Sequence, residues 1–181
     1  MIMNGLQIIK AVEIVPEMEN LFKGVYINKN LPYNLIGKKD YFFIVNTLNK
    51  VSQSMGHWIL FFIRDFELLF FDSFAMTPEY YDWEIYDFFE AYPYKKKIVF
   101  NKPLQRDSSY TCGAYSITFA YYMTKGKTLY YIKSLFSNNK TKNDSYVVSF
   151  LYSLVGFQQN CSIELCPNVN FNNKCNMFCI C

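Results

Sequence analysis

The chain has 181 residues, of which 51% are hydrophobic and 20% aromatic, and this composition excludes a disordered or low-complexity protein. Its length fits one domain with a buried core, and no stretch has the roughly 18 apolar residues of a membrane span. Eighteen basic and fifteen acidic residues leave a formal net charge of +3, which is too small to indicate a nucleic-acid-binding protein by itself.

The N-terminal third of the chain predicts one short helix and one buried strand. Pro16 and Glu17 are suited to open a helix, and Gly24 is suited to end it. Residues 28–32 have the Asn and Pro content of a turn. The aromatic and β-branched run at residues 41–47 has no polar alternation, as expected for a strand that is buried on both faces.

A β-hairpin is predicted after the polar residues 48–55. Its strands are residues 57–63 and 67–72, joined by a short turn. His57 begins the first strand and Asp72 ends the second, so antiparallel pairing would bring the two side chains together. An imidazole that acts as a base needs an acceptor for its second nitrogen, and Asp72 could be that acceptor. The alternative is that Asp72 only caps the turn that follows.

The remaining chain predicts mainly helices. Thr77 and Pro78 are suited to open a helix at 77–92, and its aromatic positions at three-residue spacing predict a stripe facing the core, namely Tyr80, Trp83, Tyr86, Phe89 and also Phe88. A short strand at 97–101 follows, and then helices at 112–124, 128–137 and 144–156, the last capped by Asp144. This order of elements indicates the α+β class.

Cys112 is the candidate nucleophile. It is the only cysteine before residue 161, and His57 is the only histidine in the chain, so a Cys-His pair can form in only one way. A helix N-terminus and a nearby imidazolium both favour a thiolate. Gln105, seven residues earlier, could form an oxyanion hole with the backbone amide of Cys112. A buried structural thiol and a solvated glutamine are the alternatives for these two residues.

Together these segments resemble the adenovirus-type cysteine endopeptidases (adenains), most closely the forms in Maverick/Polinton elements and related large DNA viruses. The resemblance rests on Gly56-His57-Trp58, on Phe71-Asp72-Ser73-Phe74 and on Gln105 before Cys112-Gly113. It spans roughly residues 20–125. It implies a central mixed β-sheet packed against helices, with the nucleophile at the N-terminus of a central helix, in a single domain at 1–157 that is followed by a Cys-rich tail at 158–181.

The resemblance also implies roles for single residues. His57 would be the general base and then the acid toward the leaving amine, Asp72 would orient the imidazole, and Cys112 would attack the carbonyl. Gln105 would complete the oxyanion hole. Trp58 and Gly56 would help to shape the substrate-binding site, although core packing is an equal alternative for Trp58. The chemistry would need no metal and no cofactor.

The function implied by the resemblance is cleavage of viral precursor proteins at Gly-containing sites during virion maturation. The expected location is the host nucleus or cytoplasm and the virion, since the N-terminus lacks a secretory signal, and the expected state is a monomer. SUMO and ubiquitin-like proteases share the order His, Asp, Gln, Cys, so deconjugation is the alternative. A third alternative is a non-enzymatic module that binds DNA or a capsid partner through a lysine-rich face, namely Lys125, Lys127, Lys133, Lys140 and Lys142.

The chain departs from this family at three places. Ala75 stands where the family often has glycine. No cysteine precedes Cys112, so an activating peptide tethered by a disulfide is not expected, whereas a non-covalent activating peptide or DNA stays open. The tail holds five further cysteines at irregular spacing, for which zinc, disulfides and a flexible thiol-rich segment are all open interpretations.

Overall fold

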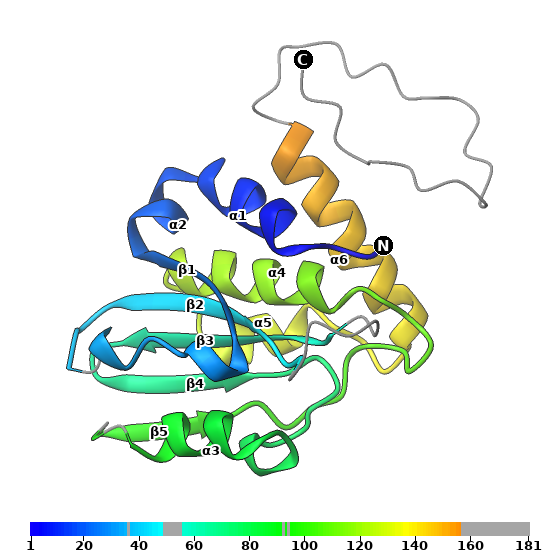
Figure 1. The fold of residues 1–181 in the computed structure, drawn as a ribbon. Coiled ribbons are helices and arrows are strands. Elements are labelled where there is room, and N and C mark those ends of the chain that lie inside the picture. The colour runs from blue at the N-terminus through cyan, green and yellow to red at the C-terminus, as the bar shows by residue number, and fades with distance from the viewer. Residues whose placement is uncertain (36, 49–55, 92, 94, 157–181) are drawn as a thin grey trace.

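The computed structural model describes residues 1–35, 37–48, 56–91, 93 and 95–156. In this part of the chain a central β-sheet lies between helices on both of its faces (Figure 1). The predicted Cys-rich tail at 158–181 lies outside the described residues. None of the described helices combines the length and the apolar character that a membrane crossing requires.

The sheet has five strands in chain order, and its inner and outer pairs differ in direction. The inner pairs are antiparallel, whereas both outer pairs are parallel. The strands are β1 (Phe22–Ile27), β2 (Tyr41–Asn46), β3 (Trp58–Arg64), β4 (Glu67–Phe71) and β5 (Lys96–Val99). A mixed sheet packed against helices confirms the predicted α+β class.

Most helices cover one face of the sheet (Figure 1). They are α1 (Gly5–Glu13), α2 (Pro16–Leu21), α4 (Cys112–Thr124), α5 (Leu129–Ser134) and α6 (Lys140–Gly156). The other face carries α3 (Trp83–Glu90) and the 3₁₀ turns η1 (Asn28–Asn30), η2 (Tyr33–Leu35) and η3 (Pro78–Tyr80).

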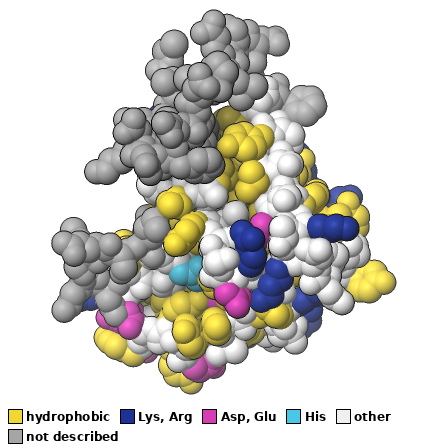
Figure 2. Space-filling model, turned by 90° about the vertical axis from the view of Figure 1, so that its right-hand side faces the viewer, with side chains coloured by type: hydrophobic (Ala, Val, Ile, Leu, Met, Phe, Trp, Pro, Cys, Tyr) yellow, Lys and Arg dark blue, Asp and Glu magenta, His cyan; other side chains and the backbone are white. Residues whose placement is uncertain are grey.

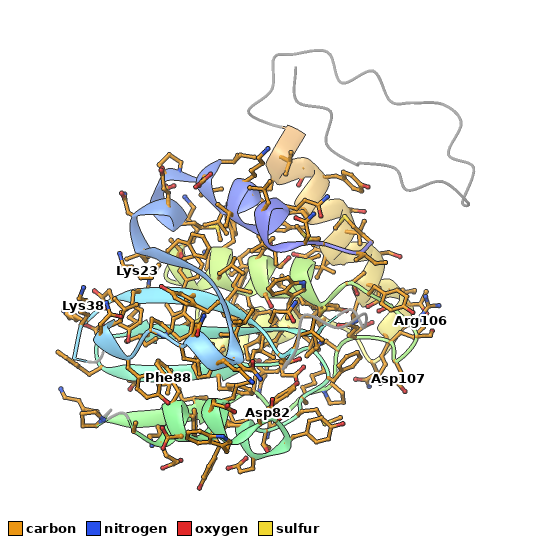
Figure 3. All side chains as sticks on the ribbon, in the orientation of Figure 1. Lys23, Lys38, Asp82, Phe88, Arg106 and Asp107 are labelled. Carbon is orange, nitrogen blue, oxygen red and sulfur yellow. The ribbon has the colours of Figure 1, made fainter. Side chains whose placement is uncertain are left out.

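Alternate residues of the central strands feed two separate cores, because successive side chains of a strand point to opposite faces. On the α4 side, Phe71 stacks on Phe119 with ring centroids 3.6 Å apart. On the α3 side, Phe43 and Phe61 stack at 5.0 Å, and Phe88 of α3 meets both rings edge to face (Figure 3). The central strands are therefore buried on both faces, as their unbroken apolar runs predict.

The N-terminal region contains more structure than its sequence pattern predicts. Helix α1 precedes the predicted helix, and β1 follows it directly. Gly24 does not end a helix, which makes that prediction wrong. It lies inside β1 with φ of +119°, where the register with β2 shifts between Phe22 and Val25. The glycine permits this irregularity because it has no Cβ.

The helix predicted at 77–92 is shorter, and its buried face was predicted correctly for Phe88 and Phe89 but wrongly for three other residues. Pro78 opens only η3, Tyr81 then turns to an extended conformation, and α3 begins at Trp83 after Asp82. The buried residues of α3 are Ile85, Phe88 and Phe89. Three of the predicted core residues are exposed instead, namely Tyr80 at 69%, Trp83 at 69% and Tyr86 at 41%.

The start of the last helix was also predicted wrongly. Helix α6 begins at Lys140, and the side chain of Asn139 accepts the backbone N–H of Lys142 at 3.1 Å, so Asn139 caps the helix. Asp144 lies one turn inside the helix and is buried. Its carboxylate makes tertiary contacts that sequence periodicity cannot show.

Candidate active site

The candidate active site lies where β3 begins, β4 ends and α4 begins. Strand register pairs Leu60 with Phe71, which places Asp72 diagonally across from His57 and not directly opposite it. Figure 2 shows the imidazole of the chain's single histidine at the molecular surface, with hydrophobic side chains around it. The hairpin thus brings these two side chains together, as the sequence predicts.

Asp72 is fully buried and accepts a hydrogen bond from His57. The distance from His57 Nε2 to Asp72 Oδ1 is 2.7 Å. The same oxygen accepts the backbone N–H of Phe74 at 2.7 Å, and Oδ2 accepts the hydroxyl of Tyr81. A buried carboxylate is costly unless donors surround it, and here both oxygens have them. The position of the carboxylate is therefore fixed from three sides.

The backbone of His57 is held by an extension of the β2–β3 ladder. Its carbonyl accepts the N–H of Thr47 at 2.9 Å, and its own N–H donates to Thr47 Oγ1 at 3.2 Å. Gly56 packs so tightly that a Cβ added there would lie 1.7 Å from Asn46 Oδ1. Gly56 therefore lets the chain pass close to the end of β2, and its role in binding substrate stays a prediction.

Cys112 is the first residue of α4 and is 8% exposed. Its sulfur lies close enough to His57 to help raise the pKa of the imidazole. Since Nε2 of the imidazole is committed to Asp72, Nδ1 is the ring atom left for the sulfur. The free N–H groups at a helix N-terminus favour negative charge at this position. The three side chains predicted to work together are thus joined in the order Asp72, His57, Cys112.

The pKa of His57 is raised from 6.5 to about 9. Burial alone would lower this pKa, but the hydrogen bonds to Asp72 and Cys112 and the negative charge of both outweigh it. At neutral pH the imidazole is therefore mostly protonated. An imidazolium between a carboxylate and a sulfur can donate a proton to a leaving group.

Gln105 is 1% exposed and its amide is locked in one orientation. Its Nε2 donates to the carbonyl of Ser109 at 2.8 Å, and its Oε1 accepts the hydroxyl of Ser73 at 2.6 Å. Because the Ser109 carbonyl can only accept, the nitrogen must be the atom facing it. One N–H of the amide is thus used within the loop, and the second is left for another acceptor.

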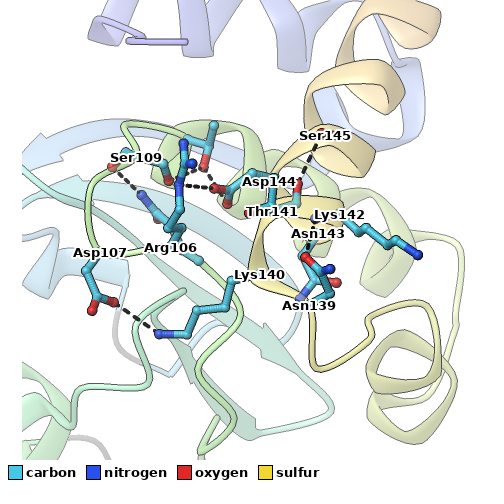
Figure 4. A network of polar contacts seen from close by, with 12 residues as sticks. Arg106, Asp107, Ser109, Asn139, Lys140, Thr141, Lys142, Asn143, Asp144 and Ser145 are labelled. Atoms are coloured by element: carbon cyan, nitrogen blue, oxygen red, sulfur yellow. Dashed lines mark hydrogen bonds and ion pairs between the residues drawn. The ribbon is translucent and has the colours of Figure 1, made fainter.

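The loop between Gln105 and Cys112 is tied to α6 (Figure 4). Lys140 pairs with Asp107 at 3.0 Å, and Arg106 lies 3.9 Å from Asp144. The other oxygen of Asp144 accepts the hydroxyls of Thr111 at 3.1 Å and Tyr115 at 3.0 Å. Asp144 therefore anchors the residue before Cys112 and the first turn of α4, a role that sequence analysis missed.

Trp58 follows His57 but turns into the core. It is 6% exposed, and its Nε1 donates to the carbonyl of Met3 at 2.9 Å. A Cβ added at Gly113 would lie 3.4 Å from its ring. Trp58 therefore packs against the start of α4, and a direct contact with substrate stays a prediction.

Two aromatic residues beside His57 were given no role by sequence analysis. Phe74 stacks on the imidazole with ring centroids 4.8 Å apart, and the ring of Tyr81 lies parallel to it at 6.4 Å. Phe74 belongs to the motif around Asp72, so its proximity could have been inferred. Tyr81 was assigned to the interior of a helix, and the only signal for it was its short distance along the chain from Asp72.

Four of the five lysines of the predicted DNA-binding face have acidic or aromatic neighbours. Lys125 pairs with Glu17, and Lys140 with Asp107. Lys127 and Lys133 lie over the rings of Tyr131 and Phe100. Lys23 and Lys38 lie at the opposite end of the sheet from Arg106 (Figure 3). DNA binding stays a prediction.

Among the described residues, no three His, Cys, Asp or Glu side chains are grouped for a metal ion.

Comparisons with known proteins give similarity at low identity. No protein-family model matches the sequence, and a search of curated proteins finds no relative. Among solved structures, the chain is similar to the Chlamydia trachomatis effector Cdu1 bound to ubiquitin, with a TM-score of 0.49 and 20% identity over 68% of this chain and 63% of that chain.

The Chlamydia trachomatis effector ChlaDUB1 is also similar in two structures, with TM-scores of 0.47 and 0.45 and 20% identity. These two matches cover 66% and 67% of this chain and 57% and 63% of the other. The chain therefore spans less than two thirds of the length of the proteins it matches. Likeness of this degree says nothing of the reaction or the substrate of this chain.

Proposed function

We propose that the chain is a cysteine peptidase in which Cys112, His57 and Asp72 carry out acyl transfer. One observation carries this proposal: the only histidine is hydrogen-bonded to a fully buried carboxylate and lies beside the candidate nucleophile, which helps to raise the pKa of the imidazole. A structural thiol would not need an imidazole held in this way. The resemblance to adenains assigns the same roles to the same residues.

In the proposed first step, the sulfur of Cys112 attacks the carbonyl carbon of the scissile bond. The carbonyl oxygen becomes an oxyanion, which the free N–H of Gln105 and the backbone amide of Cys112 would stabilise. His57 then gives its Nδ1 proton to the leaving nitrogen, the C–N bond breaks, and a thioester remains on Cys112.

The second step returns the enzyme to its resting state. The now neutral His57 takes a proton from water as the water oxygen attacks the thioester carbon. The C–S bond breaks, the acid product leaves, and the thiolate–imidazolium pair is restored. Asp72 stays ionised throughout and stabilises the imidazolium each time it forms.

Two substrate classes fit this chemistry. The adenain resemblance favours internal Gly-containing sites in viral precursor proteins, cleaved in an infected cell or a virion, with a peptide or DNA as a non-covalent activator. The shared order of His, Asp, Gln and Cys equally fits removal of a ubiquitin-like modifier, and ubiquitin is the molecule bound in the Cdu1 structure. We therefore propose a peptidase for Gly-containing sites and treat the two classes as arms of one experiment.

The decisive experiment is covalent trapping of the nucleophile. The protein is incubated with a Gly-containing peptide aldehyde or vinyl sulfone, and the adduct is mapped by mass spectrometry. We expect the label on Cys112 and not on the five tail cysteines, and no labelling of Cys112 in the His57→Ala variant. Equal labelling in both proteins would contradict the proposed activation by His57.

Cleavage assays separate the substrate classes. One substrate is a quenched peptide with an internal Gly-containing site, and the second is ubiquitin with a fluorescent group on its C-terminal glycine. Cys112→Ala should abolish either activity while changing the melting temperature little. Cleavage of only the first, with or without added DNA, favours precursor processing, and cleavage of only the second favours deconjugation. Cleavage that persists in Cys112→Ala would refute the peptidase proposal, and DNA binding without cleavage would favour the non-enzymatic alternative.

A further inference from the structure

Tyr81 is bonded to the oxygen of Asp72 that His57 does not use. His57 and the Phe74 amide share Oδ1, whereas the hydroxyl of Tyr81 donates to Oδ2. Since Asp72 is fully buried, an unbonded Oδ2 would be a costly defect. Tyr81 removes that defect and at the same time fixes the rotation of the carboxylate.

Tyr81 is held in place through its backbone and its ring, which also meets the ring of Tyr80 edge to face at 5.4 Å. Its backbone N–H donates to the carbonyl of Pro78 at 3.2 Å, which closes η3. Its ring lies 6.3 Å from that of Phe70 and parallel to the imidazole of His57 at 6.4 Å. The hydroxyl is thus presented to Asp72 by a short, packed segment and not by a freely rotating side chain.

We propose that Tyr81 is a positioning residue of the active site, which orients Asp72 and moderates the charge that His57 experiences. This inference rests on the proposed peptidase function. Tyr81 touches no reacting atom in this scheme and acts through Asp72. It extends the chain of contacts to four side chains, in the order Tyr81, Asp72, His57, Cys112.

The hydroxyl of Tyr81 remains a donor over the working pH range. Burial, and then the charge and hydrogen bond of Asp72, raise the pKa of Tyr81 above its usual value of 10.0. A neutral donor on Oδ2 draws negative charge away from Oδ1. Without it, the carboxylate would stabilise the imidazolium more strongly and would also be freer to rotate. The expected results are a higher pKa of His57 and slower turnover.

The test is an NMR titration of His57, which is unambiguous because the chain has one histidine. It is carried out on the wild-type protein, on Tyr81→Phe and on the control Tyr80→Phe, whose side chain is 69% exposed. We expect the pKa of His57 to be higher by about 0.5 in Tyr81→Phe and unchanged in Tyr80→Phe. An unchanged value in Tyr81→Phe would overturn the proposal, whether or not the protein cleaves any substrate.

Activity gives a second readout once a substrate is found. In Tyr81→Phe we expect kcat to fall about 10-fold with KM little changed, as when an outer partner of a functional histidine is removed. In the Asp72→Asn background, Tyr81→Phe should no longer shift the pKa of His57. If Tyr81→Phe fails to fold, Tyr81→Met is titrated instead, and failure of both variants to fold would assign Tyr81 a structural role and refute the proposal. Absence of cleavage by the wild-type protein would refute the peptidase function and not the geometry tested here.

Discussion

Ala75 is the clearest case of a single residue under backbone strain. It follows the Asp72 turn with φ of +62°, a conformation in which Cβ crowds the carbonyl. We expect Ala75→Gly to raise the free energy of unfolding by about 1 kcal/mol. Urea denaturation measures this, and Ala91→Gly, at φ of −60° on an exposed site, is the matched control that should be neutral or destabilising. A destabilised Ala75→Gly protein would contradict the strain assigned to this position.

The pH dependence of the site also belongs to single residues. Since the raised pKa of His57 is about 9, the proton for the leaving amine is present below pH 9 and lost above it. We expect kcat/KM to fall on the alkaline side with a midpoint near 9. Asp72→Asn removes both a hydrogen bond and a negative charge from the imidazole, so the midpoint should move to lower pH. A midpoint that stays near 9 in Asp72→Asn would show that Asp72 does not raise it.

At the scale of elements, Asp144 joins α6 to the nucleophile helix. Removing its carboxylate would take a charged acceptor from the hydroxyls of Tyr115 and Thr111, which would keep only the Leu104 carbonyl and the Ser109 hydroxyl as partners. We expect Asp144→Ala to lower the free energy of unfolding by about 2 to 3 kcal/mol and to slow alkylation of Cys112. Asp107→Asn is the control, because its exposed ion pair with Lys140 contributes little. Equal effects of the two substitutions on alkylation would rule out a special role for Asp144.

Elements with strong local signals were predictable from sequence. The unbroken apolar runs of β2, β3 and β4 predict strands that are buried on both faces. The span of α4 is predicted because its apolar run has clear ends. Strand β1 was missed because its parallel partner lies later in the chain and its glycine reads as a helix end. The start of α3 was mistaken because Tyr81 leaves the helical conformation, which moves the helix start by several residues and leaves Tyr80 outside the helix.

The same distinction holds for the candidate site. The proximity of His57, Asp72 and Cys112 could be predicted because each is rare in the chain or lies beside a recognisable strand or helix end, whereas Gln105 was singled out by the resemblance to adenains. Tyr81 could not be predicted, because tyrosine is common here, and the role of Asp144 could not, because its contacts join elements that are distant in sequence. What sequence cannot supply is the tertiary placement of ordinary residue types.

At the scale of the whole molecule, the central sheet couples two cores that share no helix. Phe88 packs on one face of β2 and β3, and Trp58 lies under α4 on the other. If the two cores unfold as one cooperative unit, a substitution that damages either core should lower the midpoint of a single unfolding transition. We expect Phe88→Ala to lower the free energy of unfolding by about 3 to 5 kcal/mol. The urea midpoint reported by a probe on the opposite face of the sheet should fall as well.

The two tryptophans make this measurable, because Trp58 lies under α4 and Trp83 lies exposed on α3. A Trp83→Phe background leaves Trp58 as the only fluorescent indole, so its signal reports the nucleophile side alone. Adding Phe88→Ala should lower the urea midpoint of the Trp58 fluorescence transition. The urea concentration at which Cys112 becomes open to alkylation should fall to the same value. If the Trp58 transition stays in place while far-ultraviolet circular dichroism shifts, the two faces unfold separately, and the geometry around Cys112 depends on the α4 side alone.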